Sequence, residues 1–205
     1  MAPYRLTYLP KRGRAEQIRL LLQELDQPYE DVHVSGESFL ALKSRRPRVL
    51  WFGMVPLLED GDLRLQQAPV IMSYLARKHG IAPAGLADAS RADAIAWSAE
   101  DLRIEYFDVW RDDSAALQAA LVRGSWTQRY LPGFDELLER SGTGFLVGDR
   151  LSHADIAVWD ILDSMTTWVA GASLDGFPRL GEFDAAIRAR PRIAAYLASD
   201  RRLPG

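Results

Sequence analysis

The hydrophobic and polar positions of this chain change their period within the first 25 residues. Tyr4, Leu6 and Tyr8 alternate with polar side chains, which is the period-two pattern of a strand with one buried face. Pro10 and Gly13 then break the pattern. The next apolar positions have helical spacing and are Ala15, Ile18, Leu21, Leu22 and Leu25. The pattern therefore predicts a strand that ends at Tyr8, a short basic turn, and a helix that opens at Arg14.

The rest of the first 79 residues continues as strands and one more helix. Residues 28–34 predict a second strand, parallel to the first through a βαβ crossover, and a less regular segment follows it. Residues 55–58 and 63–65 flank an acidic turn that contains Asp-Gly, which predicts a hairpin. Pro69 suits the start of a helix and Gly80 suits its end. Residues 1–79 therefore predict a βαβ-ββα domain.

Beyond a short segment rich in small residues, the pattern is helical. Residues 80–90 predict a linker, and residues 91–205 predict an all-helical domain with a kink at Pro132-Gly133 and a last helix from Pro191. Ser152 and Asp155 have the spacing of a capping box, so we expect them to cap a helix rather than to do chemistry with His153. The expected fold class is α/β plus all-α.

Composition narrows the possible functions. The 205 residues carry a formal net charge of −3, which argues against a general nucleic-acid binder. No apolar run suits a membrane span and no signal-peptide core is evident, so we expect a cytoplasmic protein without a membrane or metal partner. The chain has no cysteine. If the strand-turn-helix opening belongs to a thioredoxin-like domain, any reactive sulfur must therefore arrive on the substrate.

Four motifs resemble the tyrosine-type cytosolic glutathione transferases, especially their sigma, pi and mu classes. They are YLPKRGRAEQIRLLL (residues 8–22), VPLLEDGDLRLQQA (55–68), EDLR (100–103) and FLVGDRLSHAD (145–155), and they follow the order and spacing of that family. The resemblance implies a thioredoxin-like first domain and a homodimer. It also implies that glutathione is the co-substrate and a small electrophile its reaction partner.

The resemblance also implies roles for individual residues. Tyr8 and Arg14 would be catalytic, and Phe52 would be an aromatic key inserted into the partner subunit. The implied glutathione contacts are Tyr8, Arg14, Phe39, Lys43, Gly53, Met54, Val55, Pro56 with a cis bond before it, Gln67, Ala68 and, across the dimer, Asp101. The implied electrophile pocket contains Leu9, Lys11, Phe107, Arg111 and the C-terminal residues. On the residues alone, some of these have a plainer alternative: Tyr8 as a core aromatic, and the charged side chains as solvated.

Three implied contacts depart from the family's pattern. Ala68 stands where a serine hydroxyl normally binds the γ-glutamyl carboxylate, Met54 replaces Gln or Lys, and Phe39 replaces a common Trp. One lost hydrogen bond to a carboxylate costs about 1.5–3 kcal/mol, so we expect a weakened glutathione site. A site that has drifted to another ligand is the alternative.

The implied chemistry is attack by a thiolate. A free thiol has a pKa near 8.5, and a phenol that donates a hydrogen bond to sulfur favours the anion. We therefore expect a glutathione transferase. Two alternatives stay open, a glutathione-dependent isomerase and a non-catalytic ligand-binding protein of the same fold.

Overall fold

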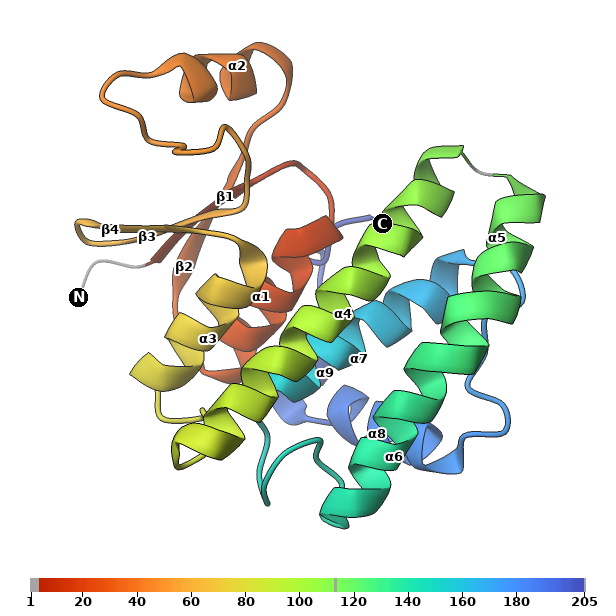
Figure 1. Ribbon diagram of the computed structural model, residues 1–205. Helices are drawn as coiled ribbons and strands as arrows, with labels where there is room; N and C mark the ends of the chain where they lie inside the picture. The colour runs from red at the N-terminus through yellow and green to blue at the C-terminus, as the bar shows by residue number, and fades with distance from the viewer. Residues whose placement is uncertain (1–3, 113, 205) are drawn as a thin grey trace. The chain divides into compact units, whose positions relative to one another are not determined.

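The computed structural model describes residues 4–112 and 114–204, which form two compact units (Figure 1). The first unit runs up to Lys78 and also includes the chain from Pro191 onward, and the second runs from His79 to Arg190. The predicted division into 1–79, 80–90 and 91–205 follows the order of the chain. The compact units differ from it because helix α9 (Pro191–Leu197) packs against helix α1 (Gly13–Glu24) of the first unit.

A four-stranded sheet forms the centre of the first unit. Its strands are β1 (Tyr4–Tyr8), β2 (Tyr29–His33), β3 (Leu57–Asp60) and β4 (Leu63–Gln66), in the order β2-β1-β3-β4. β1 and β2 are parallel, whereas β3 is antiparallel to both β1 and β4. The β3–β4 turn consists of Gly61 and Asp62, and Gly61 has a φ of +59° that favours glycine. The predicted parallel pair, hairpin and thioredoxin-like arrangement are confirmed.

Helices α1 and α3 (Ala68–Lys78) pack against each other in this unit (Figure 1). The side chains of Leu6, Ile18 and Ile71 are fully buried. The helix predicted after the basic turn is confirmed, but α1 is buried at every position from Ala15 to Leu22 rather than along the predicted stripe, and Leu25 follows the helix and is half-buried.

Helix α2 (Gly36–Ser44) occupies the segment that the sequence predicted to be less regular. None of its residues is fully buried, so it has no continuous apolar stripe that a periodicity argument could detect. Its start is fixed locally, since the backbone N–H of Ser35 donates to the Ser38 hydroxyl at 2.9 Å.

The second unit is helical, as predicted. It contains α4 (Leu86–Asp112), α5 (Ala115–Leu121), the π-helical segment η1 (Val122–Tyr130), α6 (Leu131–Ser141), α7 (His153–Trp168) and α8 (Pro178–Arg188). α7 is buried at every position from His153 to Met165 and packs against α4. The predicted kink at Pro132-Gly133 is wrong. Pro132 lies in the first turn of α6, where its missing N–H costs nothing, and the non-helical residue is Gly124.

A buried capping box begins α7. The Asp155 carboxylate accepts hydrogen bonds from the backbone N–H groups of Leu146 at 2.8 Å and Ser152 at 2.7 Å. Burial raises the pKa of Asp155, and these N–H donors oppose the rise. Ser152 and Asp155 therefore stabilise the backbone at the start of α7.

Among the described residues, no helix combines the length and apolar character needed to cross a membrane.

Candidate active site

The Tyr8 side chain lies at the end of β1, directly beside the start of α1. Its phenolic oxygen accepts a hydrogen bond from the backbone N–H of Arg14 at 3.1 Å, and the residue is only 5% exposed. The residue before the helix, Arg12, makes no side-chain hydrogen bond that caps it. The phenol therefore satisfies one of the N–H groups that a helix leaves unpaired at its N-terminus.

Gly13 is the residue that allows this close approach. Its φ is +46°, and a Cβ atom at this position would lie 2.7 Å from the Tyr8 hydroxyl and 3.0 Å from the ring. Any other residue would meet both backbone strain and a clash with the phenol. The sequence indicated Gly13 only as a break between strand and helix, so its role in placing Tyr8 was missed.

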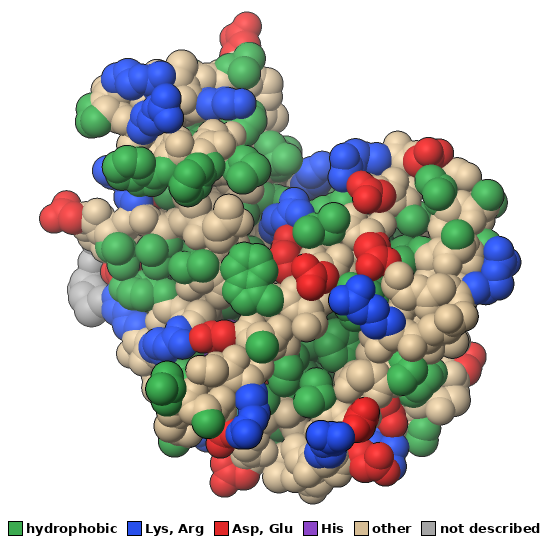
Figure 2. Space-filling view, viewed as in Figure 1, with side chains coloured by type: hydrophobic (Ala, Val, Ile, Leu, Met, Phe, Trp, Pro, Cys, Tyr) green, Lys and Arg blue, Asp and Glu red, His purple; other side chains and the backbone are tan. Residues whose placement is uncertain are grey.

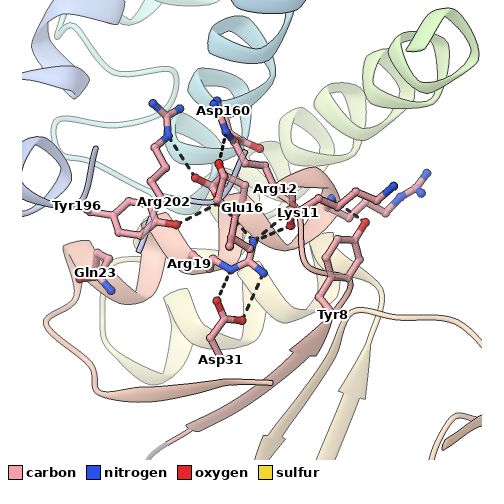
Figure 3. A network of polar contacts seen from close by, with 12 residues as sticks. Tyr8, Lys11, Arg12, Glu16, Arg19, Gln23, Asp31, Asp160, Tyr196 and Arg202 are labelled. Atoms are coloured by element: carbon pink, nitrogen blue, oxygen red, sulfur yellow. Dashed lines mark hydrogen bonds and ion pairs between the residues drawn. The ribbon is translucent and has the colours of Figure 1, made fainter. Parts of the chain in front are cut away.

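The turn between Tyr8 and the helix is held from within the unit by a buried guanidinium (Figure 3). Arg19 is fully buried, and its Nη1 donates to the carbonyl oxygens of Lys11 at 3.1 Å and Arg12 at 3.4 Å. It also forms a two-pronged pair with Asp31 of β2, at 2.8 and 3.3 Å. Burying a charge is unfavourable unless it is paired, so Asp31 fixes where Arg19, and with it the turn, can lie.

A second set of predicted residues surrounds Pro56. The Val55–Pro56 bond is cis, as the resemblance implied. The loop before it is held by a residue that the sequence analysis missed, Gln66 at the end of β4. Its Oε1 accepts from the N–H of Trp51 at 2.8 Å, and its Nε2 donates to the carbonyl of Met54 at 2.5 Å. Both partners are backbone groups, so the Gln66 side chain fixes the path of the chain into Pro56.

Lys43 and Phe39 approach this loop from α2. A Cβ at Gly53 would lie 2.7 Å from the Lys43 Cε, so the lysine stem lies directly against the backbone of the loop at Gly53. Phe39 packs against the buried cluster that contains Val49, Leu50 and Leu57. Its ring has no N–H, so Phe39 can contribute only apolar contact to a peptide ligand.

Gln67 and Ala68 lie at the N-terminus of α3. Gln67 is exposed and has a φ of +71°, a conformation that is uncommon for a residue with a side chain and that concentrates at functional sites. Ala68 is 1% exposed. A helix N-terminus favours anions, so the backbone at Ala68 suits a carboxylate even without a hydroxyl side chain.

The remaining predicted residues lie on the surface or near it. In the first unit, Leu9 and Lys11 are half-buried, and Phe52 is 75% exposed. Asp101, Phe107 and Arg111 belong to α4 of the second unit. Asp101 is exposed, whereas Arg111 pairs with Asp108 of its own helix at 2.9 Å. Roles for these residues stay predictions.

Comparison with known proteins identifies the family. Residues 4–77 match the model of the glutathione S-transferase N-terminal domain, and residues 100–200 match that of the C-terminal domain. The chain is 32% identical to glutathione S-transferase P of Capra hircus over 201 residues, which cover 97% of this chain and 93% of the relative. It is 33% identical to glutathione S-transferase P 1 of Xenopus laevis, covering 98% and 95%. The chain belongs to the glutathione S-transferase family.

Solved structures agree with this assignment. One described as "Structure of NaGST-2" superposes with a TM-score of 0.86 at 27% identity and covers 98% of both chains. The prostaglandin synthase D of Nilaparvata lugens superposes with a TM-score of 0.81 at 27% identity and covers 96% of this chain and 97% of its own. The expectation of a glutathione transferase is thereby confirmed, whereas the homodimer and the cytoplasmic location stay predictions.

The geometry at Gly13 predicts a stability difference between two glycine substitutions. Gly13→Ala should lower the free energy of unfolding by about 1–3 kcal/mol more than Gly61→Ala, because only the former adds a clash to the backbone strain. Gly61 is the matched control, since it also has a positive φ but no atom near its Cβ position. Urea unfolding measures both. Equal losses would show that the phenol does not need the space at Gly13.

Proposed function

We propose that this chain is a transferase in which Tyr8 stabilises the thiolate of bound glutathione for attack on a small electrophile. The observation that carries the proposal is the hydrogen bond from the Arg14 N–H to the Tyr8 hydroxyl. A hydroxyl that accepts one hydrogen bond becomes a stronger donor in the next, because hydrogen bonds in a chain polarise one another. The positive end of α1 adds to the potential that favours an anion near the phenol.

The energetic demand on such a site is modest. About 3% of a thiol with a pKa of 8.5 is ionised at pH 7. Lowering that pKa by about two units makes roughly three-quarters of it nucleophilic and requires about 3 kcal/mol of preferential stabilisation. One oriented donor together with a helix N-terminus is of that order. In the proposed step the sulfur bonds to the electrophilic carbon, and the leaving group departs with the bonding electrons.

The rest of the peptide would be held along the segment from Gly53 to Pro56 and at the start of α3. The Val55 backbone next to the cis bond would pair with the extended peptide, and Lys43 would meet the glycine carboxylate. Gln67 and the α3 N-terminus would hold the γ-glutamyl group. Arg14 would add positive charge, and Asp101 would reach the ammonium group from the partner subunit. With Ala68, Met54 and Phe39 each lacking a polar group usual in the family, we propose a working but weak glutathione site.

The electrophile would lie against Leu9, Lys11, Phe107 and Arg111.

A second candidate function is a glutathione-dependent isomerase, in which the thiolate adds to the substrate and leaves again. The similarity to the prostaglandin synthase D of Nilaparvata lugens favours this candidate. Titration of free thiol during turnover separates the two functions, because only conjugation consumes glutathione. Binding of glutathione without any rate enhancement would instead support the non-catalytic alternative.

Tyr8→Phe tests the catalytic proposal. We expect kcat to fall by about 10²-fold and the dissociation constant for glutathione to stay within a few-fold, because the donor acts mainly on the thiolate. The variant should also lose about 1 kcal/mol of stability, since the α1 N–H loses its cap. Unchanged kcat together with the expected loss of stability would leave Tyr8 as a capping residue alone.

Ala68→Ser tests the proposed weakness of the site. If the γ-glutamyl carboxylate lies at the start of α3, the added hydroxyl should tighten glutathione binding by about tenfold and change kcat less. Titration calorimetry of both proteins at one pH and salt concentration measures the effect, with urea unfolding as a check that the buried position accepts the oxygen. Unchanged or weaker binding by a stably folded variant would indicate a different native ligand.

We also propose a homodimer with Phe52 as its aromatic key. An exposed apolar patch at Trp51, Phe52 and Met54 follows α2, and Figure 2 shows hydrophobic side chains gathered in that region beside Lys and Arg. Patches of this kind on otherwise polar surfaces mark interaction sites. Buried aromatic side chains supply much of the energy of such interfaces.

Phe52→Ser tests the dimer. We expect association to weaken by roughly 30-fold or more, because losing a buried aromatic anchor costs at least about 2 kcal/mol. Leu40→Ser is the control, since Leu40 is also an exposed apolar residue, 62% exposed on α2. Sedimentation velocity over a concentration series measures both variants. A wild-type protein that is monomeric and fully active would refute the proposal.

A further inference from the structure

The chain returns to the first unit with α9, and the residues that follow α9 contact the turn between Tyr8 and Arg14. The backbone N–H of Arg12 donates to the carbonyl of Pro204 at 3.2 Å, and its Nε donates to the carbonyl of Leu203 at 2.9 Å. These contacts join residues that are about 190 positions apart in the sequence. The turn is therefore held on two sides, by Arg19 at its carbonyl groups and by residues 203–204 at Arg12.

The segment that supplies these carbonyls, residues 199–204, is itself anchored in the core of the unit (Figure 3). Glu16 of α1 is fully buried, and its Oε2 accepts from the Tyr196 hydroxyl at 3.2 Å. Its Oε1 lies 3.5 Å from the Nε of Arg202, which is 15% exposed at the side chain. Burial raises the pKa of the Glu16 carboxyl, and the neighbouring arginines oppose that rise. Glu16 thus links the 199–204 segment to the first turn of the helix that Tyr8 caps.

We propose that the 199–204 segment is a positioning element for thiol activation: by holding Arg12, it keeps the Tyr8 hydroxyl and the first N–H groups of α1 aimed at the glutathione sulfur, an inference that rests on the function proposed above. Arg12 directly precedes Gly13 and Arg14, the two residues that decide where the phenol lies. A small shift of Arg12 therefore changes the length of the bond between the Arg14 N–H and the phenol. Loss of the segment should impair the ionisation of the thiol more than the binding of the peptide.

The experiment compares two shortened chains. A chain that ends at Arg202 lacks both acceptors of Arg12, the carbonyls of Leu203 and Pro204. A chain that ends at Pro204 keeps both acceptors. Each shortened chain has a new terminal carboxylate, so the chain ending at Pro204 is the control for shortening as such. The pKa of bound glutathione is measured from the absorbance of the thiolate as a function of pH, and the dissociation constant is measured by calorimetry. We expect the chain ending at Arg202 to raise the thiol pKa by about one unit, which lowers the rate at pH 6.5 by up to tenfold. Its dissociation constant should change by less than threefold.

Point variants of Arg12 distinguish an effect of its position on the thiol pKa from an effect of its charge. Arg12→Ala should raise the thiol pKa, and Arg12→Lys should restore part of the effect because lysine can still donate to Leu203. In the chain ending at Arg202, Arg12→Ala should add little, since residues in contact have non-additive effects. Arg64→Ala is the control for the loss of one positive charge: it lies on β4, outside the 199–204 segment, where its Nε donates to Glu59 at 3.1 Å, and the variant should leave the thiol pKa unchanged.

The outcomes are distinct. If wild-type protein shows thiolate and the chain ending at Arg202 has the same thiol pKa, this inference is overturned and the proposed function stands. If Arg12→Ala and the shortening are additive, Arg12 acts through its charge and the positioning role is again overturned. If wild-type protein shows no thiolate of bound glutathione, both the inference and the proposed function fail.

Discussion

The buried guanidinium of Arg19 organises the first unit. A charge without contact with solvent must find its counter-charge and its acceptors inside the protein. Arg19 finds them in three places, the Asp31 carboxylate on β2, the Glu16 carboxylate one turn earlier on α1, and the carbonyls of the turn after β1. The strand, the helix and the turn consequently cannot move independently. The position of the Tyr8 phenol thus depends on the ion pairs and hydrogen bonds of Arg19 as well as on apolar packing.

The loop before Pro56 is held in place by neutral groups rather than by a buried charge. The Gln66 carboxamide offers one donor and one acceptor, and it uses both on the backbone of the loop before Pro56. Val49 and Leu50 anchor the first part of this loop in a buried cluster, whereas Trp51, Phe52 and Met54 are exposed. Side-chain hydrogen bonds to the backbone thus order the exposed part of the loop, where packing is absent. Glutathione would then meet a surface that is already formed, which lowers the entropic cost of binding.

Much of the fold could be predicted from the sequence because its signals are local. Alternation in β1, the helical spacing of apolar residues in α1 and the Asp-Gly turn each depend on neighbours within a few residues. Helix α2 could not be predicted, because it buries no residue fully. Glu16 and Arg19 are charged, and charged positions of a helix usually face solvent, so their burial depends on a strand that periodicity cannot place beside them.

The residues of the candidate site likewise fall into those that could be predicted from the sequence and those that could not. The position of Tyr8 beside the start of α1 and the cis bond before Pro56 could be predicted, because the motifs that carry the resemblance include these residues. Gln66 and the 199–204 segment could not, because their partners are backbone atoms 12 to about 190 residues away. Hydrogen bonds to distant backbone groups leave no trace in residue type, since any residue offers the same N–H and carbonyl.

The hydrogen bond between Tyr8 and α1 has a consequence for how this site can diverge. Since the phenol completes the helix N-terminus, selection for a stable chain retains the tyrosine whether or not a thiol is ever activated beside it. Stability and the proposed chemistry, which often compete at active sites, here favour the same residue. Met54 has no such structural role, and because its side chain is 53% exposed, a substitution there can adapt the site to another ligand at little cost in stability. A change of ligand is accordingly easier to accommodate at the exposed edge of the site than at the tyrosine that completes the helix.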